Sequence, residues 1–258
     1  MTADLRTVYV LWFREVIRMW KEPTRILGVV VQPLIFWLVI GAGFMPSFRL
    51  DQNAGVDYMQ FFYPGVLAMV ILFTAIFSTI TLIDDKASGF MQLVLVAPGG
   101  RASIVLGKSL GVTTIALIQA SLFLLVAPFA GVSVQAVHWP LLFAVVLFGA
   151  LALALLGFVF AWWTESSAAY HALMSIILIP MWILSGGMFP PSSPWIQTIV
   201  WLNPMGWLVA GIRAAFAGGV APLGTVPFGL DAPMAVSLLV AFCMLLIWIG
   251  VWICNRKR

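Results

Sequence analysis

Three consecutive residues, Gly107, Lys108 and Ser109, have the types found at the end of a phosphate-binding loop. In such a loop backbone amides cradle the phosphates, the lysine reaches them, and the hydroxyl binds magnesium. The pattern also requires a glycine five residues before Gly107, where this chain has Ala102. No strand is expected before it, and an apolar run follows at once. We therefore expect this chain to bind neither ATP nor magnesium.

Serine and histidine could form a hydrolytic pair only within hydrogen-bond reach of each other. Ser185 follows His171 by 14 residues on one expected helix, which is about 21 Å along the axis. Ser175 shares a face with His171, but no third group is placed to orient the imidazole. A local polar contact or a pore-lining pair is expected instead. His138 and His171 have no cysteine or carboxylate at ligand spacing, so no metal site is expected.

Composition accounts for this scarcity of catalytic groups. The chain has 258 residues, 63% of them apolar and 9% charged, with a mean hydropathy of +1.09. A soluble domain is about 45–50% apolar and about 25% charged. These values exclude a soluble enzyme, a nucleic-acid-binding domain and a disordered chain. They predict an integral membrane protein that contacts lipids and no nucleic acid.

Six apolar runs have the length of membrane-spanning helices, which need about 20 residues. They are about twice as long as transmembrane strands and do not alternate in polarity. We predict an all-α membrane protein, a single domain over residues 1–258 with six transmembrane helices. The runs lie at about residues 26–46, 61–83, 109–131, 139–163, 168–189 and 233–254. All nine acidic residues lie at or beyond the ends of these runs, so ion coupling has no evident carboxylate within the bilayer.

Positive charge predicts the orientation. Eleven of the 13 lysine and arginine residues lie in residues 1–25, in residues 84–108 or in the C-terminal tail. The other two are Arg49 and Arg213. Because lysine and arginine concentrate in cytoplasmic segments, both termini and residues 84–108 are expected in the cytoplasm.

Two cytoplasmic segments are predicted to be helical. Residues 4–25 place Arg14, Arg18, Lys21 and Arg25 along one side and apolar residues along the other, which is typical of a helix in the membrane interface. The alternative is a positively charged anchor for the first run. Residues 84–97 open with two aspartates that suit a helix N-terminus. The apolar face of this second helix predicts either a docking site for a partner protein or a helix lying on lipid.

Residues 190–219 are apolar but interrupted, and Asn203 and Pro204 separate two half-length helices. Neither half can cross the bilayer, so we predict a re-entrant helical hairpin on the outer side. Asn203 is expected to cap the second half-helix at Pro204, and Arg213 to reach the membrane interface. The hairpin is expected to pack over the outer ends of runs five and six and close a pathway. The alternative is an anchor in the outer leaflet.

Two segments together resemble the type-2 permease family, the membrane subunits of ATP-binding-cassette exporters. From Asp85 to Lys108 an acidic residue, a Gly-hydrophobic pair, a proline and an arginine precede a Leu-Gly-Lys sequence. From Trp195 the second segment passes through Asn203 and Pro204 to an Ile-Arg-Ala sequence at Arg213. The resemblance covers nearly the whole chain.

This resemblance implies a role for each segment. Residues 4–25 would be the connecting helix, and residues 84–97 the coupling helix that docks on a separate cytosolic ATPase carrying ATP and magnesium. Two permease chains, expected as a homodimer in a bacterial inner membrane, would assemble with two ATPase copies. They would export a lipophilic drug, a lipid or a lipid-linked glycan by alternating access, with no enzymatic activity in this chain alone. The alternative is a stand-alone channel or an ion-coupled secondary transporter, which predicts intramembrane charges or inverted repeats.

The candidate site residues fall into three groups. The expected ATPase-coupling residues are Asp85, Gly89, Phe90, Met91, Leu93, Pro98 and Arg101. The expected outer-gate residues are Trp195, Trp201, Asn203, Pro204 and Arg213. The candidates for lining a pathway are Gln32, Phe36, Phe44, Phe73 and His171. For the aromatic residues among these, contact with lipid or with neighbouring helices is the alternative.

Overall fold

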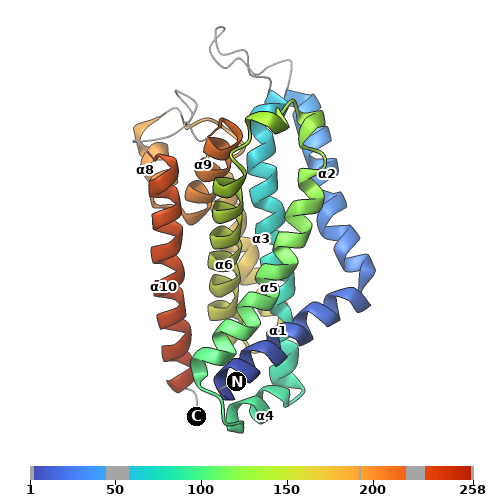
Figure 1. Cartoon of the computed structure of the whole chain (residues 1–258), viewed down its shortest axis with the longest axis vertical. Coiled ribbons are helices and arrows are strands. Elements are labelled where there is room, and N and C mark those ends of the chain that lie inside the picture. The colour runs from blue at the N-terminus through green and yellow to red at the C-terminus, as the bar shows by residue number, and fades with distance from the viewer. Residues whose placement is uncertain (1–2, 45–57, 192, 219–229, 257–258) are drawn as a thin grey trace.

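The computed structural model describes residues 3–44, 58–191, 193–218 and 230–256. In these ranges the chain forms ten α-helices and two short 3-10 helices and contains no strand (Figure 1). The all-α prediction is therefore confirmed for the described part. The α-helices are α1 (Ala3–Lys21), α2 (Pro23–Phe44), α3 (Tyr58–Ala87), α4 (Phe90–Val96), α5 (Arg101–Leu124), α6 (Trp139–Trp163), α7 (Ser167–Ile183), α8 (Pro194–Leu202), α9 (Pro204–Phe216) and α10 (Ala232–Arg256). The 3-10 helices are Ala127–Ala130 and Val134–Ala136.

Within the described ranges four helices, α3, α5, α6 and α10, have the length and hydropathy of membrane spans. Helices α8 and α9 meet the same criteria only as a pair, and the pair is bent by 93° at Asn203. Two further apolar helices are shorter, namely Val31–Gly43 within α2 and the 17-residue α7. The chain is a multi-pass membrane protein with four candidate spans, or five if the bent pair is one span.

Helix α3 lies at the centre of the bundle, where α2, α5 and α6 pack around it. Its aromatic residues Phe62 and Tyr63 are fully buried. A glycine allows α6 to approach closely, because a Cβ at Gly157 would lie only 2.7 Å from Oγ1 of Thr79 on α3. Small residues let helix backbones approach in this way. The small-residue stripe of α6 is buried along its length, at Ala150, Ala154, Gly157 and Ala161.

The bundle has two ends that differ in content. Helices α1 and α4 and the last turn of α10 lie at the lower end in Figure 1, and α8 and α9 lie at the upper end. We call these the α4 end and the hairpin end. The first turn of α1 and the last turn of α10 thus lie at the same end of the bundle (Figure 1).

Helix boundaries at the α4 end differ from the predicted ones. The predicted helix over residues 4–25 ends at Lys21, and α2 begins at Pro23. Helix α5 begins at Arg101, eight residues before the predicted start at residue 109. Residues 101–108 include Arg101, Ser103 and Lys108, so hydropathy alone does not reveal that they belong to a helix. Ser103 and Lys108 are bonded to Asp4 and Glu15 of α1. The predicted helix over residues 84–97 contains only α4 and the last turn of α3.

Candidate functional site

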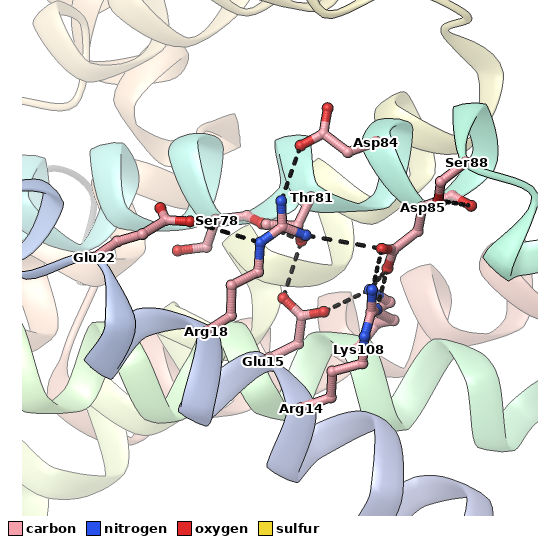
Figure 2. A network of polar contacts seen from close by, with 10 residues as sticks. All are labelled: Arg14, Glu15, Arg18, Glu22, Ser78, Thr81, Asp84, Asp85, Ser88 and Lys108. Atoms are coloured by element: carbon pink, nitrogen blue, oxygen red, sulfur yellow. Dashed lines mark hydrogen bonds and ion pairs between the residues drawn. The ribbon is translucent and has the colours of Figure 1, made fainter.

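Charged side chains from three helices form a buried cluster at the α4 end (Figure 2). Nζ of Lys108 on α5 donates to the carboxylates of Glu15 on α1, at 2.5 Å, and Asp85 on α3. Arg14 on α1 donates to both carboxylate oxygens of Asp85, each at 2.6 Å. The Lys108, Glu15 and Asp85 side chains are at most 4% exposed. Two carboxylates therefore face two cations, which offsets the cost of removing these charges from water.

The cluster continues toward solvent through Arg18. Its guanidinium lies 3.2 Å from a carboxylate oxygen of Asp84, 3.7 Å from one of Asp85 and 3.8 Å from one of Glu22. The remaining oxygen of the buried Glu15 accepts from Oγ1 of Thr81 at 2.9 Å. Exposed ion pairs stabilise little, so the buried members hold the last turns of α3 against α1.

The predicted position of Asp84 and Asp85 at a helix N-terminus is wrong. Both residues lie near the C-terminal end of α3, one turn before its end at Ala87. The helix dipole disfavours negative charge there, and the cations from α1 and α5 offset this. Asp85 is 1% exposed and its carboxylate faces α1 and α5.

Helix α1 packs closely along α5, and glycines of α5 make this possible. A Cβ at Gly107 would lie 2.9 Å from Cβ of Leu11, and one at Gly111 would lie 2.6 Å from Cβ of Glu15. These two glycines flank Lys108 along α5 and bring α1 close enough for the ammonium to reach Glu15. Farther along, Nε1 of Trp12 donates to Oγ1 of Thr114 at 2.9 Å.

The first turn of α1 holds the first turn of α5. Oδ1 of Asp4 accepts from the backbone N–H of Gly100 at 2.6 Å and from Oγ of Ser103 at 2.9 Å. Gly100 is the N-cap residue of α5, so a carboxylate from another helix satisfies one of its free amides. These two hydrogen bonds lower the pKa of Asp4 below its ordinary value.

Helix α4 projects from the α4 end after a left-handed Gly89, whose φ is 76°. Glycine adopts this conformation without the strain that a side chain would cause. Met91 is 2% exposed and anchors α4 on the bundle, whereas Leu93 is 69% and Val96 83% exposed. Helix α4 thus packs Met91 against the bundle and exposes Leu93 and Val96.

Two of the other predicted coupling residues, Phe90 and Arg101, support α4. Phe90 is half-buried beneath Arg14, whose Cζ lies 3.9 Å from the ring centroid. Arg101 donates to the backbone carbonyl of Leu95 at 2.8 Å, which satisfies a carbonyl in the last turn of α4. Pro98 is exposed in the turn between α4 and α5.

At the hairpin end, Asn203 lies at the bend between α8 and α9. Its Oδ1 accepts from the backbone N–H of Met205 at 3.0 Å, and Pro204 is the first residue of α9. The predicted cap is therefore confirmed. Nδ2 of Asn203 donates to the backbone carbonyls of Met181 at 2.6 Å and Leu184 at 3.2 Å, so the same side chain fastens the bend to the end of α7.

The hairpin contacts both helices predicted for it, α7 and α10, and in addition packs on α6. Helix α9 packs mainly against α10 and α6 and to a smaller extent against α3 and α7. Helix α10, the sixth predicted run, is thus a main partner of α9, whereas α7, the fifth run, contacts α9 less than α6 does. Trp201 is half-buried and its carbonyl accepts from Nε1 of Trp207 at 2.5 Å. Trp195 is 64% exposed.

The predicted reach of Arg213 to the membrane interface is wrong. Arg213 is only 6% exposed. Its Nη2 donates to the backbone carbonyl of Gly186 at 2.8 Å, and its Cζ lies 4.1 Å from the ring centroid of Phe61 on α3. Peptide dipoles and an aromatic face stabilise the guanidinium there. Arg213 thus fastens α9 to α3 and to the turn after α7.

The five pathway candidates do not form one group. Phe36 on α2 packs against Phe62 and Trp182, with ring centroids 6.0 and 5.6 Å apart. Phe73 on α3 is half-buried beside Phe77. The remaining three candidates are Gln32 and His171, which are exposed, and Phe44, whose side chain lies outside the described part of the structure.

The groups considered for catalysis have structural partners. Oγ of Ser185 donates to the backbone carbonyl of Trp182 at 2.6 Å and accepts from the N–H of Gly187. Oγ of Ser175 donates to the backbone carbonyl of His171 at 2.9 Å. Ser175 therefore makes a local polar contact with His171, through the carbonyl of His171 and not through its imidazole. Among the described residues no group of three histidine, cysteine or carboxylate side chains could hold a metal ion.

Sequence reasoning missed the buried cluster and one further contact. Lys86 donates to three backbone carbonyls at the end of α6. One signal was available, since Glu15 interrupts a mostly apolar helix side and Lys108 stands where an apolar run begins. A charge in such a place is expensive unless a partner is near. Which residue is the partner cannot be told from the sequence, because the paired residues lie on different helices.

The fold and this distribution of charge define a helical multi-pass membrane protein. Residues 6–217 match the profile of the ABC-2 type transporter family. The chain therefore belongs to this family, as a membrane permease of an ABC transporter, and the resemblance inferred from its motifs is confirmed. The family's permease domain does not itself hydrolyse ATP, so an ATPase subunit is its partner.

Curated relatives agree with this assignment. The chain is 27% identical over 224 residues to the putative transport permease ycf38 of Cyanophora paradoxa, covering 83% of this chain and 75% of that protein. It is 31% identical over 221 residues to nodulation protein J of Sinorhizobium fredii, covering 78% and 80%. It is 26% identical over 164 residues to the probable multidrug ABC transporter permease YbhR of Escherichia coli, covering 59% of this chain and 42% of that protein.

Proposed function

We propose that this chain is the permease subunit of an ATP-driven exporter in which α4 receives the movement of a cytosolic ATPase. The observation that carries the proposal is the exposure of Leu93 and Val96 on a helix whose opposite side is anchored by Met91. Exposed apolar side chains on a firmly held element favour a protein partner. The buried cluster behind α4 supports this role, because it makes the α4 end resist deformation.

The proposed topology has six spans, formed by the four candidate spans α3, α5, α6 and α10 together with α2 and α7. Helix α2 has 22 residues, enough for the hydrocarbon core, and α7 with 17 residues is at the lower limit. An even number of spans fits the position of α1 and the last turn of α10 at one end (Figure 1). The excess of basic residues at that end favours the cytoplasm.

Transport then follows from a two-state switch. ATP binding closes two ATPase copies, and their closed form binds a different permease conformation more tightly, which shifts the equilibrium. Two permease copies form the pathway between them. The hairpin of α8 and α9 closes this pathway from outside, and the fastening of its bend by Asn203 supports a gate in preference to a loose anchor.

A lipophilic drug, a lipid or a lipid-linked glycan is the proposed cargo. The ring cluster of Phe36, Phe62 and Trp182 joins α2, α3 and α7, and Phe36 is its half-buried member. One relative is named a probable multidrug permease, which is compatible with a lipophilic substrate.

The docking role of α4 is tested with Leu93→Asp, which places a charge in the proposed interface. An unpaired charge buried by a partner costs several kcal/mol, so we expect at least a tenfold loss of ATPase co-purifying with the tagged permease. Ala102→Asp adds the same charge at an exposed position on α5 and should leave the yield unchanged. Co-purification of Leu93→Asp at the wild-type yield would show that the ATPase does not dock on this side of α4.

A further inference from the structure

The last turn of α3 is bonded on a second side, away from the charged cluster. Nζ of Lys86 donates to the backbone carbonyls of Ala161 at 2.7 Å, Trp162 at 3.0 Å and Thr164 at 2.6 Å. These carbonyls belong to the last turn of α6 and to its C-cap residue Thr164. Such carbonyls have no partner within a helix and carry its negative dipole end. An ammonium group has three donors, and here each has an acceptor.

Lys86 is also next to the element that receives the ATPase. The backbone N–H of Gly89 donates to the carbonyl of Lys86 at 3.2 Å, and the N–H of Ser88 donates to the carbonyl of Asp84 at 2.9 Å. These bonds close the turn between α3 and α4. A displacement of α4 therefore displaces the last turn of α3, and Lys86 transfers it to the end of α6.

The N-terminal half of α6, away from Lys86, is in close contact with α9 of the hairpin. A Cβ at Gly149 on α6 would lie 2.5 Å from Cδ1 of Leu208 on α9, and a Cβ at Gly211 on α9 would lie 2.7 Å from Cγ2 of Val145 on α6. Packed interiors have few voids to absorb a shift, so α9 cannot stay in place when α6 moves. From Gly149 to Thr164 the helix extends about 22 Å.

We propose that Lys86 is a positioning residue for transport, which attaches α6 to the α4 end so that α6 carries the movement of α4 to the outer hairpin. This inference rests on the proposed function, in which α4 docks on the ATPase and the hairpin closes the pathway. The cluster around Lys108 holds α1, α3 and α5 together, and Lys86 adds α6. A merely stabilising role for Lys86 would affect unfolding and leave communication between the two ends intact.

The test measures communication directly. The permease with its cognate ATPase is placed in nanodiscs of phosphatidylethanolamine and phosphatidylglycerol, with Cys243 and Cys254 replaced by alanine and a single cysteine introduced by Thr198→Cys. Thr198 is exposed on α8. The rate of its reaction with a maleimide is compared without nucleotide and after trapping with ATP and vanadate. We expect at least a threefold change with Lys86 present.

Lys86→Met should abolish this ATP-dependent change while ATP hydrolysis continues, and Lys86→Arg should restore most of it, because a guanidinium also donates to carbonyls. Lys21→Met removes an exposed ammonium at the same end and should leave the change intact. An unaltered change in Lys86→Met would overturn the proposal. Failure of both Lys86→Met and Lys86→Gln to assemble with the ATPase would also overturn it, since Lys86 would then be required for folding.

The Thr198→Cys protein that retains Lys86 distinguishes an error in the proposed function from an error in the role of Lys86. If position 198 reacts at the same rate in both states with Lys86 present, the hairpin does not respond to ATP. The gating role in the proposed function is then wrong, and so is the proposed transmission of movement through α6. If the background responds and Lys86→Met responds equally, only the role of Lys86 is wrong.

Discussion

Arg14 of α1 and Asp85 of α3 form a two-pronged ion pair across 71 residues of sequence, with both N–O distances at 2.6 Å. The planar guanidinium matches the carboxylate geometry, so the pair fixes an angle as well as a distance. Asp85 lies four residues before Gly89, where the chain turns into α4. The position of α1 and the position of α4 are therefore linked through one carboxylate.

Lys108→Met should strongly destabilise the permease. The substitution removes the ammonium between Glu15 and Asp85 and leaves Glu15 buried with only the Thr81 hydroxyl as a hydrogen-bond donor among the contacts described. Breaking a buried ion pair on one side costs about 3–5 kcal/mol. We expect a clearly lower unfolding temperature in detergent by differential scanning fluorimetry.

The double variant Lys108→Met with Glu15→Gln provides the control for that prediction. It removes the orphaned charge, and residues in one network couple by about 0.5–3 kcal/mol. The double variant should therefore be more stable than Lys108→Met alone. An additive loss from the two substitutions would mean that the Glu15–Lys108 pair contributes nothing to the cluster.

Asp4→Asn should loosen the start of α5 in a pH-dependent manner. The pKa of Asp4 is lowered because its ionised form accepts hydrogen bonds from Gly100 and Ser103. A lowered pKa stabilises the fold above the ordinary value of about 3.9, and this contribution is lost as the pH falls through the lower folded value.

The measurement is the difference in unfolding temperature between the wild type and Asp4→Asn from pH 3 to pH 7. The wild type should be more stable by a constant difference above about pH 4, and the difference should shrink below it. A difference that grows on acidification would contradict the assigned role of the carboxylate.

Asn203→Leu should loosen the hairpin, because it removes the cap on Met205 and the two bonds to the carbonyls of Met181 and Leu184. An unsatisfied buried group costs about 1–3 kcal/mol. In the purified complex we expect a higher basal ATPase rate together with less coupled export.

Asn203→Asp separates the two contributions of this residue. Its carboxylate still accepts from Met205 but cannot donate to α7, so an effect equal to that of Asn203→Leu would assign the role to the α7 contacts. If Asn203→Leu transports at the wild-type rate with unchanged ATPase activity, the hairpin is only an anchor.

Single cysteines test the orientation. Val96→Cys on α4 and Thr198→Cys on α8 are both at exposed positions at opposite ends of the bundle. In intact cells an impermeant maleimide should label position 198 and not position 96, while permeabilised cells should show both. Labelling of position 96 from outside would invert the topology.

The sequence by itself determined the class of protein and most of its helices. Long apolar runs are local properties, and a bilayer admits few other structures for them. The observed α6 (Trp139–Trp163) has the bounds of the predicted run at 139–163. The cap by Asn203 was also predictable, because an amide oxygen before a proline at N1 acts within a few residues of the chain.

Tertiary structure alone decided where the charges lie. Glu15, Asp85 and Lys108 come from three helices, and the sequence does not reveal that their side chains meet in a buried site. From the sequence, Arg213 was expected at the membrane interface, yet it is only 6% exposed. Its guanidinium is held there by the backbone carbonyl of Gly186 and the ring of Phe61, which belong to other elements. A charge can be buried only where partners satisfy it, and partners that are distant in sequence become neighbours only when the helices pack.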